Sequence, residues 1–193
     1  MRKTVAIMLL AALLLAASGL AGCSLLSNAN DEANDLITAA NVHLKKYQAS
    51  DDNVRVLAAQ VGTLGITPAD ATQALTLTAQ IKTELQVQKV ELQAASAQIA
   101  KIKTIDADET FKEYANLMVK ALTAQEAVVD EGIKVYAEMD KLYTALRDGN
   151  ASTTLTSELS ANITSISNNI GTLSDASTKA FDAAATYFNK TAP

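Results

Sequence analysis

The chain has 193 residues, a formal net charge of −5, no tryptophan, two prolines and one cysteine. An acidic chain with dispersed lysines lacks the basic surface that nucleic-acid binding needs, so no nucleic-acid partner is expected. One cysteine rules out a disulfide framework. The scarcity of proline favours long helices, and no segment shows the apolar-polar alternation of strands.

The N-terminal segment combines a cationic start at Arg2 and Lys3, an apolar stretch over 5–17 and a small-residue region. This layout is typical of a secretory signal peptide, and the stretch is too short for a membrane-spanning helix. The segment ends in Leu20-Ala21-Gly22-Cys23, which resembles the lipobox of bacterial lipoproteins. Two alternatives are a plain signal peptide, which would release a soluble chain, and an uncleaved signal anchor.

The resemblance implies cleavage before Cys23, a diacylglyceryl thioether on its sulfur and an acylated new N-terminus, with palmitate as one such acyl group. Residues 1–22 would then be the signal peptide, and Cys23 would be the lipid attachment site. Removal of Arg2 and Lys3 takes the formal charge from −5 to −7. Without a polybasic patch, the lipid has to supply the membrane affinity.

The expected location is the extracytoplasmic side of the cell membrane or of the outer membrane. Ser24 follows the cysteine, whereas in Gram-negative lipoproteins of this type an aspartate there marks retention in the inner membrane. In an organism with an outer membrane, the protein would therefore be sent to the outer membrane. In any other organism, it would stay on the outer face of the cell membrane.

Residues 23–30 are expected to be a lipidated tether, and residues 31–193 a helical bundle domain. A first helix is predicted from Asp31 to about Gln48, because apolar residues recur there at steps of three and four. Ser50 or Asp51 would then cap a shorter helix that ends at about Leu64. The first long rod of the fold, over residues 31–64, is therefore expected to be two helices with a break near Ser50.

The second helix is predicted to begin at Pro68, with Thr67 as its N-cap, and to end near Thr104. Its seam keeps heptad spacing for more than four repeats, which favours a bundle or coiled coil. The seam consists of Ala71, Ala74, Thr78, Ile81, Leu85, Gln88, Leu92, Ala95, Ile99 and Ile102.

The third helix is predicted to follow a cap at Asp106, with Glu109 as its capping-box partner, and to end near Asp148. Two adjacent apolar stripes indicate that it contacts more than one neighbour. The fourth helix is predicted from about Ser152 to about Asn189. It is rich in Ser, Thr and Asn, so packing is expected to hold it helical while its C-terminal end frays.

Short turns between these helices force antiparallel neighbours. The predicted fold is therefore all-α. It is an elongated antiparallel up-down bundle of about four helices, which pack through heptad-spaced seams.

The inventory of reactive residues argues against an enzyme, a metal site and a cofactor. The single histidine, His43, has no Glu-x-x-His partner pattern of the kind that bundle metal sites use, and is expected to be a partly buried packing residue. Three carboxylate clusters are expected to be structural. Asp51-Asp52 and Asp106/Asp108/Glu109 are expected at helix starts, and Asp130-Glu131 on the outer face of the third helix.

The sequence therefore predicts a non-enzymatic scaffold or partner-binding module in the cell envelope, with an envelope protein or a cell-wall component as partner. The alternative is a small-molecule-binding or sensory bundle. Its pocket would lie among Gln88, Gln125 and Gly132, since these residues interrupt the apolar seams. Polar residues in a seam also set helix register, which is the simpler interpretation. A glycine there would allow a close helix approach or leave a small hollow.

Overall fold

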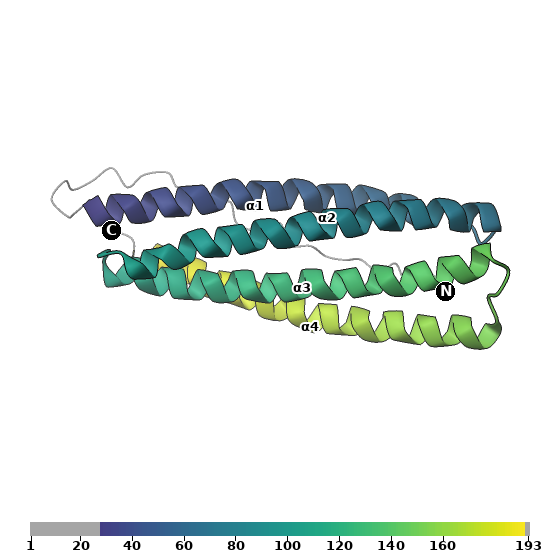
Figure 1. The fold of residues 1–193 in the computed structure, drawn as a ribbon. Coiled ribbons are helices and arrows are strands. Elements are labelled where there is room, and N and C mark those ends of the chain that lie inside the picture. The colour runs from purple at the N-terminus through teal and green to yellow at the C-terminus, as the bar shows by residue number, and fades with distance from the viewer. Residues whose placement is uncertain (1–27, 192–193) are drawn as a thin grey trace.

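The computed structural model describes residues 28–191, which form four long α-helices and no strand. The helices are α1 (Asn28–Val61), α2 (Pro68–Lys101), α3 (Glu109–Arg147) and α4 (Thr153–Thr191), and a short 3₁₀ helix η1 (Ile102–Thr104) follows α2. They run antiparallel in chain order (Figure 1). Helices of 34 and 39 residues are about 50–60 Å long. The predicted elongated all-α bundle is confirmed.

The two ends of this rod hold different elements. The proximal end holds the start of α1, η1 and the C-terminal end of α4, and the distal end holds the turns that join α1 to α2 and α3 to α4 (Figure 1).

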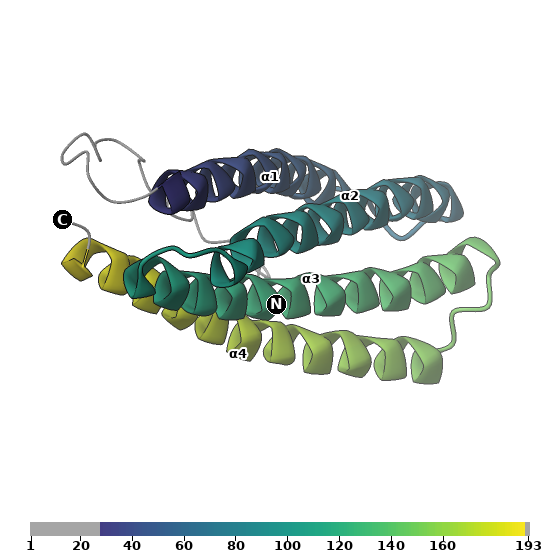
Figure 2. The same ribbon diagram turned by 60° about the vertical axis from the view of Figure 1, so that its left-hand side comes forward.

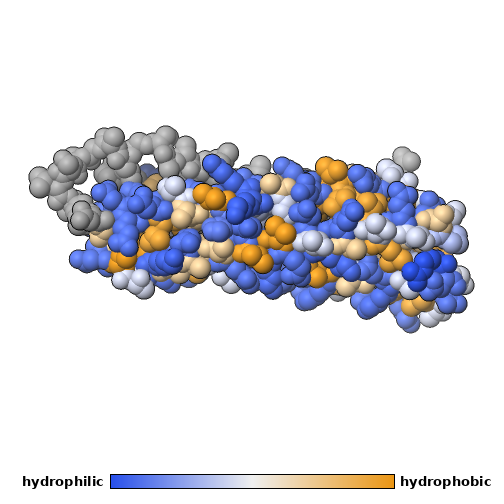
Figure 3. All heavy atoms as spheres, turned by 45° about the horizontal axis from the view of Figure 1, so that its top comes forward, coloured by the Kyte–Doolittle hydropathy of each residue, from blue (hydrophilic) through white to orange (hydrophobic). Residues whose placement is uncertain are grey.

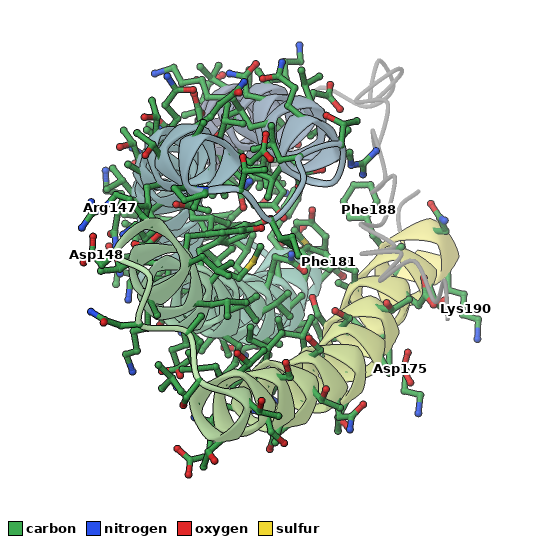
Figure 4. The ribbon with its side chains drawn as sticks, turned by 90° about the vertical axis from the view of Figure 1, so that its right-hand side faces the viewer. Arg147, Asp148, Asp175, Phe181, Phe188 and Lys190 are labelled. Carbon is green, nitrogen blue, oxygen red and sulfur yellow. The ribbon has the colours of Figure 1, made fainter. Side chains whose placement is uncertain are left out.

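Each helix packs against the next one along the chain, whereas α1 and α4 do not form a close-packed pair. At the distal end, α4 lies beyond α3 from the side of α1 and α2 (Figures 1 and 2). Toward the proximal end, α4 crosses α3 and rises toward the side of α1 (Figure 4). The bundle is therefore more closed at its proximal end than at its distal end.

The predicted break near Ser50 is wrong, because α1 is one continuous helix of 34 residues. The Ser50 hydroxyl lies 2.8 Å from the carbonyl oxygen and 2.7 Å from the Oε2 atom of Glu84 on α2. Its hydrogen bond therefore crosses the helix interface and does not cap a new helix. Asp51 is also buried. The helix begins at Asn28, three residues before Asp31, so part of the expected tether is helical.

The predicted start of α2 is confirmed. Thr67 is the N-cap, and its hydroxyl accepts a hydrogen bond from the backbone N–H of Asp70 at 3.2 Å. The Asp70 carboxylate accepts the N–H of Thr67 in return. At the end of α3, Gly149 adopts a φ of 70°, the left-handed conformation that terminates many helices.

The predicted cap of α3 at Asp106 is wrong, because Asp108 occupies that position. Its N–H donates to the side-chain oxygen of Asn30, and its carboxylate accepts from the amide of Asn30 at 2.8 Å. The carboxylate thus fastens α3 to the start of α1, a partner 78 residues away that no local capping pattern could reveal.

The proximal core includes the C-terminal part of α4, which we define as residues 175–191. The rings of Phe188 and Tyr114 lie 5.0 Å apart, and Ala184 is fully buried. Figure 4 shows Phe181 and Phe188 pointing from α4 toward the interior. In the distal part of α4, residues 153–174, Leu159 alone is buried.

Candidate functional site

A buried polar layer lies near the middle of the bundle and joins three helices. The side-chain amide of Gln125 on α3 donates to the hydroxyl oxygen of Tyr47 on α1 at 2.7 Å. Its carbonyl oxygen accepts the hydroxyl of Ser177 on α4 at 2.8 Å. Tyr47 is 8% exposed, Gln125 7% and Ser177 0%. Both ends of the Gln125 amide are therefore used inside the protein.

The phenol of Tyr47 stays protonated in this layer. Burial, and next the negative charge of Asp51, raise its pKa well above the usual range of tyrosine. A neutral hydroxyl costs far less to bury than a charged one, provided that it is hydrogen-bonded. The contact with Gln125 meets this condition.

Gln88 on α2 lies at the level of this layer. It stands between Glu84 and Glu91 on the same helix, which bind Ser50 and His43 of α1. Its side chain is 1% exposed, and its Nε2 atom has no hydrogen-bond partner among the described residues. A buried hydrogen-bond donor without a partner is costly. The Nε2 atom of Gln88 is therefore an unsatisfied polar atom at the level of this layer.

The seam has room for one methyl group beside Gly132. A Cβ atom added there would lie 3.6 Å and 3.7 Å from the two methyl carbons of Leu85 on α2, which is ordinary van der Waals contact. No backbone atom of another helix comes as close. The structure therefore brings Gln125 into a satisfied network, and beside Gly132 it leaves room for a Cβ atom in contact with Leu85.

His43 lies on the α1–α2 interface, where its Nδ1 atom is 2.6 Å from Oε2 of Glu91. The ammonium group of Lys46 is 3.8 Å from the other oxygen of the same carboxylate. In the part of the chain that the structure describes, no three histidine, cysteine or acidic side chains come together as a metal site would require. His43 is half-buried and hydrogen-bonded to Glu91.

Two of the carboxylate clusters lie elsewhere than the sequence predicts. Asp51 sits inside α1, not at a helix start, and pairs with Arg55 at 3.0 Å. Asp130 is 41% exposed and lies at the rim of the α2–α3 interface, where Lys89 of α2 binds its carboxylate at 2.7 and 3.0 Å. That hydrogen bond raises the pKa of Lys89. Glu131 is only 14% exposed and pairs with Lys134.

Asp51 differs from the other carboxylates in burial. Removal from water raises its pKa, an effect that the Arg55 guanidinium partly offsets. Its Oδ1 atom is buried without a hydrogen-bond partner among residues 28–191. This carboxylate lies one helical turn beyond Tyr47 toward the distal end.

Sequence reasoning flagged Gln125 but missed that Tyr47 and Ser177 both bind it. The sequence signal for this layer was a polar side chain at a seam position in several helices. Whether such side chains lie at the same level along the bundle is decided only when the helices pack. Gly171 on α4 was missed as well, and its position in the middle of a helix is a readable signal.

Cys23 lies outside the described residues. None of the described helices carries an apolar stretch long enough to cross a bilayer. Comparisons with protein-family models, with curated proteins and with solved structures gave no match for this chain. A function for this protein therefore has to be argued from the residues and contacts of the chain itself.

Proposed function

We propose that the protein is a cell-envelope lipoprotein, anchored through lipid on Cys23, and that its bundle is a non-enzymatic scaffold or partner-binding module. The sequence Leu20-Ala21-Gly22-Cys23, at the end of a signal-like segment, carries this proposal. Two or more acyl chains hold a protein stably at a membrane, whereas one short chain does not. The membrane is the first partner, and an envelope protein or cell-wall component is the second.

The start of α1 supports an anchor at the proximal end. Helix α1 begins at Asn28, so the tether from Cys23 is short and spans at most about 18 Å. The hydrogen bonds between Asn30 and Asp108 fasten this end of α1 to the start of α3. An anchored bundle would keep its proximal end near the membrane and project its distal end about 50–60 Å outward.

The polar layer supports a scaffold more than a ligand-binding bundle. Gln125 already has a partner at each end of its amide, and beside Gly132 a single added Cβ atom would already contact Leu85. Polar side chains that bind one another across helices fix register, which suits a rod of defined shape. The unpartnered Nε2 atom of Gln88 favours the alternative, a small-molecule-binding or sensory bundle.

Intact mass of the membrane fraction tests the anchor. We expect the wild-type chain to begin at Cys23 and to carry added acyl mass, and the Cys23→Ala variant to lose both the acyl mass and the membrane fraction. Ser24→Ala is the matched control, because it leaves the cysteine in place. An unmodified wild-type chain in the soluble fraction would overturn the proposal.

A further inference from the structure

Three asparagines of the chain stand two residues before a serine or a threonine. The triplets are Asn150-Ala151-Ser152, Asn162-Ile163-Thr164 and Asn189-Lys190-Thr191. This pattern, without proline at the middle position, is the acceptor sequence for N-linked glycans on exported proteins. Because so short a pattern also occurs by chance, the surroundings of each asparagine decide which of them can accept a sugar.

Two of the three asparagines lie inside helix α4, where their triplets cannot be read from one side. Successive residues of an α-helix are rotated by about 100°, so an asparagine and the residue two positions on point about 200° apart. The hydroxyls of Thr164 and Thr191 donate to backbone carbonyl oxygens of the preceding turn. The amide of Asn162 is also bound to Glu138 of α3 at 3.2 Å. Neither triplet offers its amide and its hydroxyl together to one enzyme.

Asn150 lies outside the helices, in the turn that joins α3 to α4. Its backbone N–H donates to the carbonyl oxygen of Ala145 at 2.8 Å, and the N–H of Ser152 donates to the carbonyl oxygen of Asn150 at 2.9 Å. Asn150 and Ser152 are both exposed. The backbone of this turn is therefore held in place, while both residues that define the triplet are accessible from solvent.

The hydroxyl of Ser152 can be recognised by an enzyme although it also caps α4. Its oxygen accepts the backbone N–H of Leu155 at 3.2 Å. A serine hydroxyl has one proton to donate in addition to its acceptor lone pairs. The contact with Leu155 therefore leaves the hydroxyl proton for a second partner.

The turn has room for a bulky substituent. Residues 147–150 and 152–154 are all exposed. The turn lies at the distal end of the rod (Figure 1), and Figure 4, which looks onto that end, shows Arg147 and Asp148 pointing outward at the edge of the molecule. A large hydrophilic group at this place would displace no packed side chain.

We propose that Asn150 carries an N-linked glycan, and that the Ser152 hydroxyl is the second group that the transferase recognises. This inference rests on the proposed export of the chain, because the triplet is an acceptor only in exported proteins. The enzyme is an oligosaccharide transferase of the membrane across which the chain is exported. The donor is a lipid of that membrane with an oligosaccharide on its diphosphate.

The transfer balances without any change of oxidation state. The Nδ2 atom of Asn150 forms a bond to the anomeric carbon of the first sugar, and the bond from that carbon to the diphosphate oxygen breaks. The lipid diphosphate leaves with the electron pair of the broken bond. One proton of the amide passes to a base of the transferase.

Peptide mass mapping of the full chain, purified from the membranes of its own organism, tests this site. We expect the peptide that contains Asn150 to carry added hexose or N-acetylhexosamine mass in the wild-type chain. Asn150→Gln should lose this mass without a change in melting temperature, because the residue is exposed. Asn162→Gln is the matched control and should keep the sugar on Asn150.

Ser152 separates recognition by the transferase from the stability of the fold. Ser152→Asp keeps a side chain that caps a helix but lacks the hydroxyl, so it should lose the sugar without lowering the melting temperature. Ser152→Thr restores a hydroxyl and should keep the sugar. Sugar that persists in Ser152→Asp, or sugar on Asn162 or Asn189 in place of Asn150, would overturn the assignment.

Lipid on Cys23 is measured in the same samples, which separates this inference from the proposed anchor. A lipidated chain whose Asn150 peptide carries no sugar would overturn the glycan site alone. A glycosylated chain without lipid would overturn the anchor alone. A chain that carries neither group would overturn both.

Discussion

The proximal and distal parts of α4 share one heptad seam, yet they differ in burial and in the side chains that pack against them. Near the proximal end, Ser177 binds Gln125, Ala184 is fully buried and the Phe188 ring packs against Tyr114. In the distal part, Leu159 alone is buried. The residues beside the seam explain the difference, because aromatic side chains reach across to neighbouring helices and serine or glycine cannot.

This comparison shows that a continuous seam does not guarantee continuous burial. A seam position is buried only where a second helix covers it, and α4 crosses α3 so that coverage falls toward the distal end (Figure 4).

The outer face of α1 and α2 differs from both parts of α4. It is largely hydrophilic with scattered apolar patches (Figure 3), and single exposed apolar residues are ordinary on protein surfaces.

The largest expected effect comes from removing the same side chain in each region. Ile99→Ala, in the fully buried proximal core, should lower the free energy of unfolding by about 3–4 kcal/mol through lost burial and a new cavity. Ile166→Ala, on the half-buried distal seam, should cost about 1 kcal/mol because water fills the space. Urea unfolding of the purified full chain measures both. Equal losses would contradict the contrast between the two regions.

A smaller effect is expected at the polar layer that separates the regions. Gln125→Ala removes the partner of both Tyr47 and Ser177 and leaves two hydroxyls buried. The free energy of unfolding should fall by about 2–3 kcal/mol. Gln86→Ala on the exposed side of α2 is the control, with an expected change within about 0.5 kcal/mol. A similar small change at Gln125 would show that the layer does not link the helices.

The smallest effect concerns Asp51, one turn beyond the layer. Because burial raises its pKa in the folded state, the fold is stabilised when this carboxyl is protonated and loses that stability as pH rises through the raised pKa. Asp51→Asn should therefore raise the free energy of unfolding by about 1 kcal/mol at neutral pH. The exposed Arg55 partner contributes little to offset this gain.

The pH dependence provides the check on Asp51. The advantage of Asp51→Asn over wild type should shrink as pH falls toward the ordinary titration range of aspartate, and urea midpoints at several pH values would measure it. Asp52→Asn, an exposed neighbour, should show no such dependence. An advantage that stays constant with pH would contradict the assignment to an uncompensated buried charge.

Local sequence patterns predicted most of the fold and little of the site. Thr67 and Pro68 mark a helix start through backbone chemistry that acts within a few residues, and both were correctly assigned. Ser50 was wrongly assigned a cap because serine also bonds across a helix interface, as it does here to Glu84. The cap of α3 was placed at Asp106 and lies at Asp108, whose side-chain partner Asn30 is 78 residues away. Gln125 was flagged as polar, but its partners Tyr47 and Ser177 lie 78 and 52 residues away.

The sequence by itself determined the all-α bundle, the approximate ends of α2, α3 and α4 and the heptad seams, because helix propensity, capping and heptad spacing are local properties. It also supplied the motif at Cys23 on which the proposed anchor rests. Only the tertiary structure decided which seam positions are covered, which polar side chains meet and where α4 is left open. Those outcomes depend on the crossing of whole helices, which sums small packing preferences over the length of the bundle.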